Sequence, residues 1–357
     1  MLEDFEDDSK PKSRGKGLVA AGLSIALLGG LIFGGYSLVS DSLANLISRF
    51  QVEDYEGPGG APVLITIEPG DTGEDVARKL VEADVIKSFE AIYRDMINAN
   101  PTIYPGVYEY PTQIPAAQAL QLMLSNTNKI VVQTTIPEGF SVAEIIPKLI
   151  ADLGLVESEL LAAIDNAMDR LPDTAPSIEG FLFPATYTFN PGVSSEVVIN
   201  TMLDRMEAEL ATYDFTLKQA QEILTIASIV QLEAMNEPDF FKVARVFFNR
   251  LDRNIPLQSD PTVKYYYEGS IDSFQEGMAD ESNPFNTYYN AGLPPGPISS
   301  PGSMAIEAVM RPAPGDWLYF VSINLITGET VFSETLAEHE KAAELYRQWL
   351  RDHPDYD

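Results

Sequence analysis

The side chain best suited to acid–base chemistry is Glu233, a carboxylic acid inside an otherwise apolar helical pattern. One face of the predicted helix is marked by residues at offsets of three, four and seven: Ile226, Ile229, Val230 and Glu233. Burial on this face would disfavour the charged carboxylate and raise its pKa toward neutrality, where the group can act as a general acid. Gln231 lies about 200° round the helix and is expected to point to water.

Two structural alternatives compete with this catalytic interpretation. Glu233 could form a buried ion pair with Arg245 or Arg250, or reach solvent at the helix end before Pro238. Glu222 lies on the same face three turns earlier and is a competing candidate. An acid near a helix start, however, is already explained by the helix dipole.

The loops that follow this helix are polar or rigid and could shape a binding site. They cover residues 257–263, 286–288 and 292–302. Most of them fall in the region 260–314, which is rich in Pro, Gly, Asn and Tyr and is predicted to be irregular. Prolines fix the shape of such loops and leave backbone groups available to a ligand. Tyrosines offer platforms for sugar rings, namely Tyr265, Tyr266, Tyr267, Tyr288 and Tyr289. The alternative is a long loop that packs on its own domain.

Composition argues against several other kinds of site. The 357 residues include no cysteine, which excludes disulfides, thiolate nucleophiles and Cys-type metal sites. The two histidines, His339 and His353, lie near the C-terminal end, so we expect neither a metal nor a cofactor. A formal net charge of −30 would repel nucleic acid, so no nucleic-acid partner is expected. No phosphate loop, dinucleotide fingerprint, G-x-S-x-G or H-E-x-x-H motif occurs.

A membrane anchor is predicted near the N-terminus. Residues 17–39 carry no charge and are long enough to cross a bilayer of about 30 Å. Four basic residues precede this run, at Lys10, Lys12, Arg14 and Lys16, so the positive-inside rule places the short tail in the cytoplasm and the rest of the chain outside. The alternative is a cleaved signal peptide, but the run is long and no clear A-x-A site follows it. We therefore expect a single-pass protein of the cytoplasmic (inner) membrane.

The remaining chain divides at changes of pattern. A strand, a Gly turn and a hydroxyl-capped helix recur at about 63–80 and 135–149, which favours a small module used twice. Further on, helices are expected over 217–253 with one interruption near Pro238, then a hairpin around Gly328 and a final helix capped by Thr335. The predicted divisions are a tail (1–16), the membrane helix (17–39), a linker (40–61), a first module (62–128), a second module with its connector (129–176) and a C-terminal domain (177–353).

Together these motifs resemble the YceG-like family, the MltG type of membrane-anchored endolytic murein transglycosylase. The resemblance covers about 63–350 and rests on six segments in the family's order: 179–184, 226–234, 246–251, 257–263, 286–288 and 292–302. It implies an α+β chain with a single N-terminal transmembrane helix, small LysM-like βαα-type modules and a mixed α/β catalytic domain. Family members often have Glu where this chain has Gln231, and an acidic residue where it has Ala185. Gln cannot exchange protons, so the acid role must fall on Glu233.

The resemblance implies a specific reaction. Glu233 would protonate the oxygen between N-acetylmuramic acid and N-acetylglucosamine. It would then take the proton of the muramic C6 hydroxyl as a 1,6-anhydro ring closes. The substrate would be held by residues of the three loops, listed as Gln258, Ser259, Asp260, Asn286, Thr287, Tyr288, Pro295, Ile298 and Pro301.

Two other functions stay open at this level. A muramidase-type hydrolase would use Glu233 with Asp260 as a second carboxylate. A non-catalytic envelope protein would only bind peptidoglycan strands. Peptidoglycan is the expected partner in each case, and peptidoglycan synthases of the elongation or division machinery are candidate protein partners.

Overall fold

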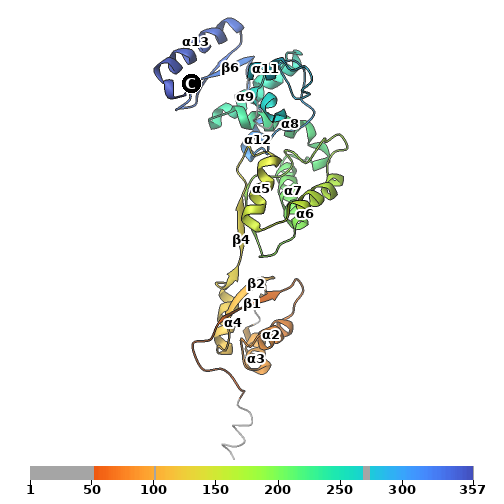
Figure 1. Ribbon diagram of the computed structural model, residues 1–357, viewed down its shortest axis with the longest axis vertical. Coiled ribbons are helices and arrows are strands. Elements are labelled where there is room, and N and C mark those ends of the chain that lie inside the picture. The colour runs from red at the N-terminus through yellow and green to blue at the C-terminus, as the bar shows by residue number, and fades with distance from the viewer. Residues whose placement is uncertain (1–51, 100–101, 268–273, 357) are drawn as a thin grey trace, which may run out of the picture. The chain divides into compact units, whose positions relative to one another are not determined.

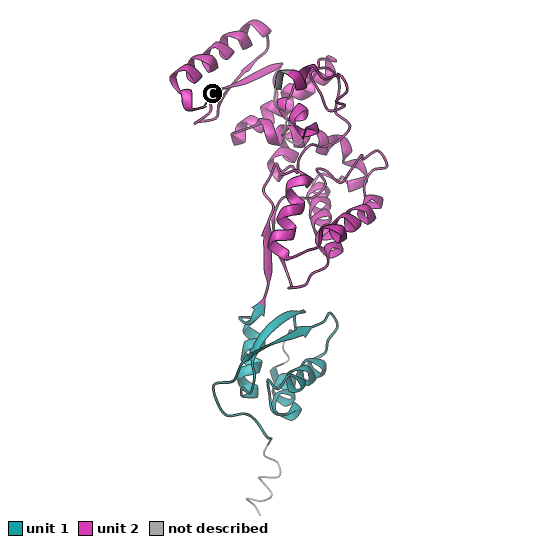
Figure 2. Cartoon of the chain, in the orientation of Figure 1, with its two compact units in different colours: residues 1–129 teal, residues 130–357 magenta. Residues whose placement is uncertain are grey.

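The computed structural model describes residues 52–99, 102–267 and 274–356. The chain divides into two compact units, residues 1–129 and 130–357 (Figure 2). The predicted membrane helix at 17–39 and the tail before it lie outside the described residues. None of the helices in the described ranges combines the length and the apolar character that a membrane crossing requires.

Over residues 52–99 and 102–129, the first unit combines a small sheet with three helices (Figure 1). Its elements are β1 (Pro62–Ile67), α2 (Gly73–Glu82), α3 (Phe89–Ala99), β2 (Gly106–Pro111), α4 (Ala116–Ser125) and β3 (Lys129–Ile130), the last of which spans the boundary. The sheet order is β1-β2-β3, and β1 runs antiparallel to β2. A separate core includes Leu80, Ile92 and Tyr110, all fully buried. This unit therefore has a hydrophobic core of its own.

The second unit begins with the same local design as the first. Strand β4 (Val132–Thr135) leads through a turn to α5 (Val142–Leu153), much as β1 leads to α2. Each helix starts with a capping box, Thr72 with Asp75 and Ser141 with Glu144, as the hydroxyl caps in the sequence predict. The strands differ in pairing, because β4 pairs antiparallel with β5 (Thr186–Phe189) in a separate two-stranded sheet. Whether the two segments are duplicates stays a prediction.

Helices fill most of the second unit. They are α6 (Glu157–Ala167), η1 (Met168–Arg170), α7 (Ser195–Ala211), η2 (Leu217–Gln219), α8 (Gln221–Glu233), α9 (Glu237–Asp252), α10 (Asp260–Tyr266), α11 (Phe274–Ala279) and α12 (Ser303–Met310). The predicted interruption near Pro238 is confirmed, since α8 ends at Glu233 and Pro238 lies in the first turn of α9. Helices α8, α9 and α12 pack against one another around a common core.

The region 260–314 is more regular than its composition predicts. Pro261 lies in the first turn of α10, where its missing N–H costs nothing, so the proline starts a helix instead of preventing one. Helix α12 forms because its apolar side chains are buried against α8 and α9, among them Ala305, Ile306 and Ala308. Tertiary packing thus overrides the irregular composition.

The C-terminal part of the second unit has the predicted hairpin and helix. Strands β6 (Tyr319–Asn324) and β7 (Glu329–Ser333) pair antiparallel around Gly328, and α13 (Leu336–Asp352) begins with the expected Thr335 capping box. The chain ends in η3 (Pro354–Tyr356). Helix α13 packs on both strands, which brings residues far apart in sequence to the vicinity of α8 and α9.

Candidate active site

Glu233 is the last residue of α8, where the helix leaves the core. Ile226, Ile229 and Val230 are at most 5% exposed, so the predicted buried face is confirmed. Ala234 then adopts an extended conformation and ends the helix. Glu233 itself is partly exposed and lines a pocket, so its carboxyl lies at the boundary between the core and an accessible cavity.

Burial raises the pKa of the Glu233 carboxyl to about 7. The Ser259 hydroxyl opposes this shift by donating a 2.6 Å hydrogen bond to Glu233 Oε1, which stabilises the ionised form. The negative charge of Asp260 raises the pKa further, whereas Lys264 and Arg250 lower it. At neutral pH the group is therefore divided between its acid and base forms, which suits a residue that gives and then takes a proton.

The ion pairs considered for Glu233 do not form in the described part of the chain, whereas the other structural alternative is met in part, because Glu233 ends α8 and is partly exposed. Arg245 donates to the Ala313 carbonyl at 2.7 Å, and Arg250 donates to the carbonyls of Leu318 at 2.6 Å and Leu257 at 2.7 Å. Neither arginine forms an ion pair with Glu233. The competing carboxylate Glu222 is exposed in the first turn of α8.

A buried hydroxyl cluster holds Ser259 under the carboxyl. The Ser259 N–H donates to Thr287 Oγ1 at 3.0 Å, and the Thr262 hydroxyl donates to the Ser259 carbonyl at 2.6 Å. The preceding residue, Gln258, has a φ of 52°, a left-handed conformation that turns the chain sharply before Ser259. The backbone thus aims one hydroxyl at Glu233 from a fixed position.

The pocket that Glu233 lines has a volume of about 410 Å³. It is lined by polar, aromatic and a few aliphatic residues, namely Glu233, Arg250, Leu257, Gln258, Asp260, Tyr288, Tyr319, Phe320, Val321, Ser322, Leu336 and His339. The Tyr288 hydroxyl donates to Asp260 Oδ1 at 2.5 Å, and Arg250 donates to Gln258 Oε1 at 3.3 Å. Fixed hydrogen-bonding groups next to aromatic rings suit the binding of a carbohydrate.

The six predicted substrate residues of the loops at 257–263 and 286–288 fall into three groups in the structure. Gln258, Asp260 and Tyr288 line the pocket with Glu233, while Ser259 and Thr287 are buried behind it. Asn286 is fully buried and donates to the carbonyls of Met278 and Asp280, both at 2.9 Å, so it holds the loop in shape.

The three residues of the Pro/Gly loop do not line the Glu233 pocket. Pro295 is exposed, and its carbonyl accepts a hydrogen bond from the Gln221 side chain at 2.9 Å. Ile298 is buried, and its backbone N–H donates to the hydroxyl of Ser228 in α8 at 3.0 Å. Pro301 is also buried. This loop packs along α8 instead of forming a wall of the pocket around Glu233.

Gln231 does not simply point to water, in contrast to the expectation from its place on the helix. Its side-chain oxygen accepts from the Gly302 N–H at 2.9 Å, and its amide donates to Glu138 at 3.3 Å. Glu138 fills the space that a Cβ at Gly302 would occupy, since the nearest carboxylate oxygen would be 2.0 Å away. Gln231 therefore joins the start of α12 to the turn before α5.

Residues from the C-terminal hairpin and α13 were not predicted as part of the site. Tyr319 and His339 stack with their ring centroids 5.3 Å apart, and the guanidinium of Arg250 lies 5.2 Å from the Tyr319 centroid. Burial, reinforced by the charge of Arg250, lowers the pKa of His339. No sequence motif marks these residues as part of a site. The sequence indicated only the hairpin, from its alternating pattern, and the final helix, from the Thr335 cap.

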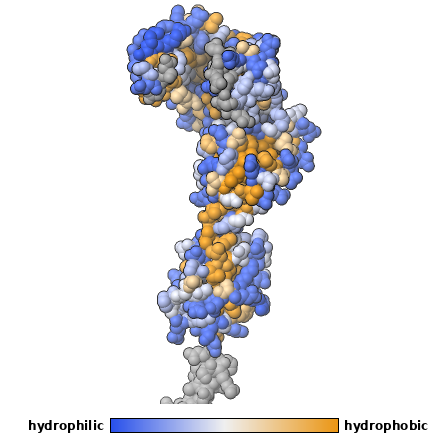
Figure 3. Space-filling model, viewed as in Figure 1, coloured by the Kyte–Doolittle hydropathy of each residue, from blue (hydrophilic) through white to orange (hydrophobic). Residues whose placement is uncertain are grey.

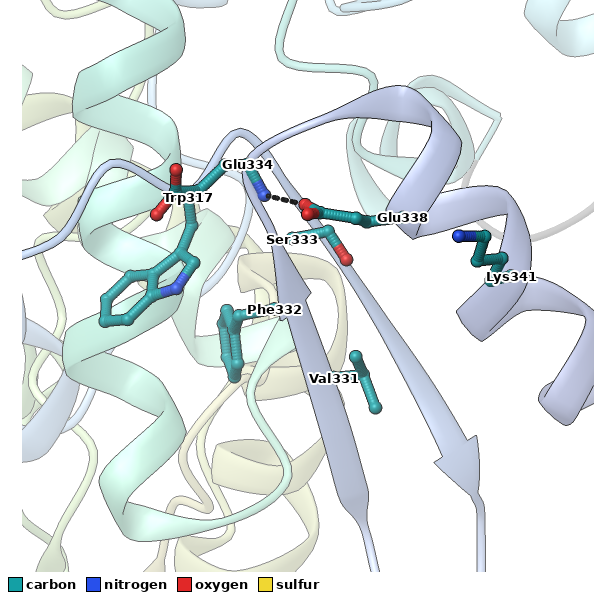
Figure 4. Close-up of a pocket in the computed structure, with 7 residues that line it drawn as sticks. All are labelled: Trp317, Val331, Phe332, Ser333, Glu334, Glu338 and Lys341. Atoms are coloured by element: carbon teal, nitrogen blue, oxygen red, sulfur yellow. Dashed lines mark hydrogen bonds between the residues drawn. The ribbon is translucent and has the colours of Figure 1, made fainter.

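A second hollow, of about 460 Å³, lies between the hairpin and α13 (Figure 4). Trp317, Phe332 and Glu338 are among the residues that line it. The Glu338 carboxylate accepts a hydrogen bond from the backbone N–H of Glu334. The backbone N–H of Thr335, followed by the Thr335 hydroxyl, lowers the pKa of Glu338. A carboxylate held ionised as a helix cap cannot supply a proton near neutral pH, so this hollow is a poorer candidate for acid catalysis than the Glu233 pocket.

Comparison with known proteins agrees with the resemblance seen in the sequence. The model of the YceG-like family matches residues 65–345. The chain belongs to the YceG-like family. This YceG-like chain is 32% identical over 338 residues to a Bacillus subtilis protein named endolytic murein transglycosylase, covering 88% of this chain and 91% of the relative.

Two further comparisons extend this result. A Streptococcus pneumoniae protein of the same name is 29% identical over 359 residues, covering 89% of this YceG-like chain and 62% of the relative. A crystal structure of a yceG-like protein from Listeria monocytogenes is 29% identical, with a TM-score of 0.51 and coverage of 79% of this chain and 99% of that one.

Proposed function

We infer that this chain is an endolytic murein transglycosylase, an enzyme that acts on peptidoglycan glycan strands. Relatives of that name match most of its length. The observation that carries the inference within the molecule is Glu233: its burial, its pKa of about 7 and its 2.6 Å hydrogen bond from Ser259 occur at a pocket lined by tyrosines. These are the properties that acid catalysis of glycosidic cleavage requires.

We propose that Glu233 acts first as acid and then as base. The protonated carboxyl gives its proton to the oxygen between N-acetylmuramic acid and N-acetylglucosamine as positive charge develops at muramic C1. The C6 hydroxyl attacks C1 and gives its proton to the carboxylate, which leaves a 1,6-anhydro end and restores the acid. The sugar supplies the nucleophile, so no second carboxylate is needed to activate water. The Ser259 hydroxyl stabilises the carboxylate between the two steps.

Substrate positioning is assigned to the polar groups beside Glu233. Gln258 and Asp260 are held by Arg250 and Tyr288, so their side chains are fixed before a ligand arrives. Tyr288 and Tyr319 present aromatic surface to the same cavity. Such prior ordering reduces the entropy lost when the sugar is oriented for attack.

A hydrolase is the second candidate, because Asp260 lines the same pocket as Glu233. Water activated by Asp260 would leave a reducing muramic end instead of an anhydro ring. Against this role, Asp260 Oδ1 already accepts a hydrogen bond from Tyr288.

Mass spectrometry of fragments released from purified peptidoglycan tests both assignments. We expect anhydro-muramic ends without incorporation of oxygen from H₂¹⁸O. Reducing ends that carry ¹⁸O would instead establish hydrolysis, and binding to sacculi without any release would establish a non-catalytic wall protein. Glu222→Gln is the matched control for Glu233→Gln, since it makes the same change at an exposed position of the same helix.

The proposal also covers the membrane anchor, the first unit and the domain limits. We propose that residues 17–39 anchor the enzyme in the cytoplasmic membrane with the tail inside, and that the unit containing α2–α4 serves as a LysM-like module. The proposed domain limits are those predicted from the sequence: 1–16, 17–39, 40–61, 62–128, 129–176 and 177–353. Peptidoglycan synthases remain candidate partners of an enzyme held at the membrane.

A further inference from the structure

A third cavity, larger than the two already described, lies in the same unit as the Glu233 pocket. Its volume is about 1080 Å³, and its walls come from the start of α5, from α6, from the turn around Glu179 and from α10. Three large side chains that line it are unusually exposed: Leu161 at 46%, Leu232 at 40% and Tyr266 at 45%. Figure 3 shows apolar residues gathered over α5 and the chain beside it. Exposed apolar surface inside a cleft is typical of a binding site.

The two cavities share a dividing ridge. Leu232 lines the large cleft, whereas its neighbour Glu233 lines the catalytic pocket. Likewise, Pro261 lines the large cleft and its neighbour Asp260 lines the catalytic pocket. Consecutive helical residues point about 100° apart, so the end of α8 and the start of α10 present one side to each cavity. Lys264 of the large cleft is near enough to Glu233 for its charge to lower the pKa of that carboxyl. A substituent of a sugar held at Glu233 would therefore have a short path into the large cleft.

The two cavities differ in the chemistry of their walls. Four rings line the catalytic pocket, from Tyr288, Tyr319, Phe320 and His339. The large cleft is more aliphatic, with Val142, Ile146, Ile164 and Met168 among its lining residues beside two tyrosines, Tyr265 and Tyr266. It also carries three acidic groups, Glu144, Asp165 and Glu179, and one basic group, Lys264. Aromatic platforms suit sugar rings, whereas aliphatic walls with acidic and basic groups suit a short peptide.

We propose that the large cleft binds the peptide stem carried by the muramic acid whose glycosidic bond is cleaved. This inference rests on the proposed function and specifies the substrate further. Muramic acid bears its stem on the lactyl group of the sugar ring, so the stem leaves the ring close to the bond under attack. Its alanine methyl groups would contact the aliphatic wall, its amine would face Asp165 and its carboxylates would face Lys264. The enzyme would then favour strands that retain their stems.

A matched pair of variants tests the cleft in the full-length chain in detergent. Ala143 is an exposed second residue of α5 that lines the cleft, so Ala143→Trp narrows it without disturbing the core. Ala117, the exposed second residue of α4 in the other unit, receives the same change as a control. The readout is the ratio of kcat/KM on stem-bearing strands to kcat/KM on strands stripped of stems by an amidase.

We expect Ala143→Trp to lower this ratio by about tenfold or more, as the loss of a shaped apolar contact does in other pockets, and Ala117→Trp to leave it unchanged. Asp165→Lys, an exposed charge reversal on α6, should lower it as well and serves if Ala143→Trp folds poorly. An unchanged ratio in both cleft variants would refute the proposal. An equal loss on both substrates would assign the cleft to the glycan instead.

A binding measurement separates this proposal from the catalytic one. The full-length Glu233→Gln chain is titrated calorimetrically with the synthetic stem L-Ala-γ-D-Glu-L-Lys-D-Ala. We expect binding that is lost when Ala143→Trp is added to Glu233→Gln. If the Glu233→Gln chain binds the stem but the unmodified chain releases no fragments from peptidoglycan, the stem site is retained and the enzyme assignment is refuted. Fragment release without stem binding or stem preference would retain the enzyme and refute the stem site.

Discussion

Two carboxyls in the second unit, Glu233 at a pocket wall and Glu179 in a buried turn, show how a similar pKa can serve different purposes. Burial raises the pKa of each to about 7. Glu233 accepts a hydrogen bond from a side chain, Ser259, and lines the pocket with Asp260 and Tyr288. Glu179 is 4% exposed, and its two oxygens accept from the backbone N–H of Val142 at 3.2 and 3.0 Å.

The difference shows that a raised pKa alone does not identify a catalytic acid. Glu179 joins the first turn of α5 to α10, because it also accepts from the Tyr265 hydroxyl at 3.3 Å. The next residue, Gly180, has a φ of +77°, and a Cβ there would come within 2.2 Å of Pro297 Cβ. Glu179 therefore lies in a tightly fixed turn, whereas Glu233 lies at an open helix end. Each carboxyl borders a cavity, Glu179 the large cleft and Glu233 the catalytic pocket. What distinguishes Glu179 is that both of its oxygens already accept hydrogen bonds from the Val142 N–H and the Tyr265 hydroxyl.

The largest expected effect separates the two carboxyls in catalysis. Glu233→Gln should lower kcat on stem-free strands by about 10²–10⁴, since it removes the group that transfers the proton. Glu179→Gln should lower it by less than about tenfold, because that carboxyl contacts backbone instead of the glycosidic bond. The measurement is the rate of fragment release at pH 6 by both folded variants. Equal losses would show that Glu233 and Glu179 contribute alike to catalysis.

Local signals in the sequence predicted much of the framework around Glu233. The caps at Thr72, Ser141 and Thr335 depend on neighbours three residues away, and the break before Pro238 is a property of proline itself. The burial of the α8 face follows from its periodicity. These features need no knowledge of tertiary contacts, which is why the sequence alone could predict them.

Features that depend on distant contacts could not be predicted in this way. Tyr319 and His339 reach the site only because α13 packs on the hairpin and β6 packs on α9. Gln231 has a polar partner only because the turn at Glu138 and the start of α12 meet beside it. Glu179 is buried beside a turn in which Gly180 closely approaches Pro297. The contacts that decide these features join residues well separated in sequence, such as Gln231 with Glu138, 93 positions away, and with Gly302, 71 positions away.

The next effect concerns stability, in which the two carboxyls should behave alike. A Glu with a folded pKa of about 7, against 4.5 when unfolded, binds more protons in the folded chain between those pH values. The free energy of unfolding therefore falls as pH rises from 4.5 to 7, by up to about 3 kcal/mol for each group. Glu179→Gln and Glu233→Gln should each reduce this loss, whereas Glu222→Gln should preserve it. Urea unfolding of the full chain at pH 5 and pH 8 measures the difference, and unchanged losses in both buried variants would contradict the burial of these carboxyls.

The smallest expected effect tests the hydrogen bond that most clearly distinguishes Glu233 from Glu179. Ser259→Ala removes a donor that stabilises the ionised carboxylate, so the pKa of Glu233 should rise. The decline of kcat with increasing pH should then occur at higher pH than in the parent enzyme. The rate at pH 6 should fall by about tenfold, because the base needed for the second step loses a charge-assisted hydrogen bond. Ser299→Ala is the control: this buried hydroxyl donates to the Ser228 carbonyl at 3.1 Å, so its loss should leave the inflection in place. An unmoved inflection in Ser259→Ala would show that the pH dependence does not report the protonation of Glu233.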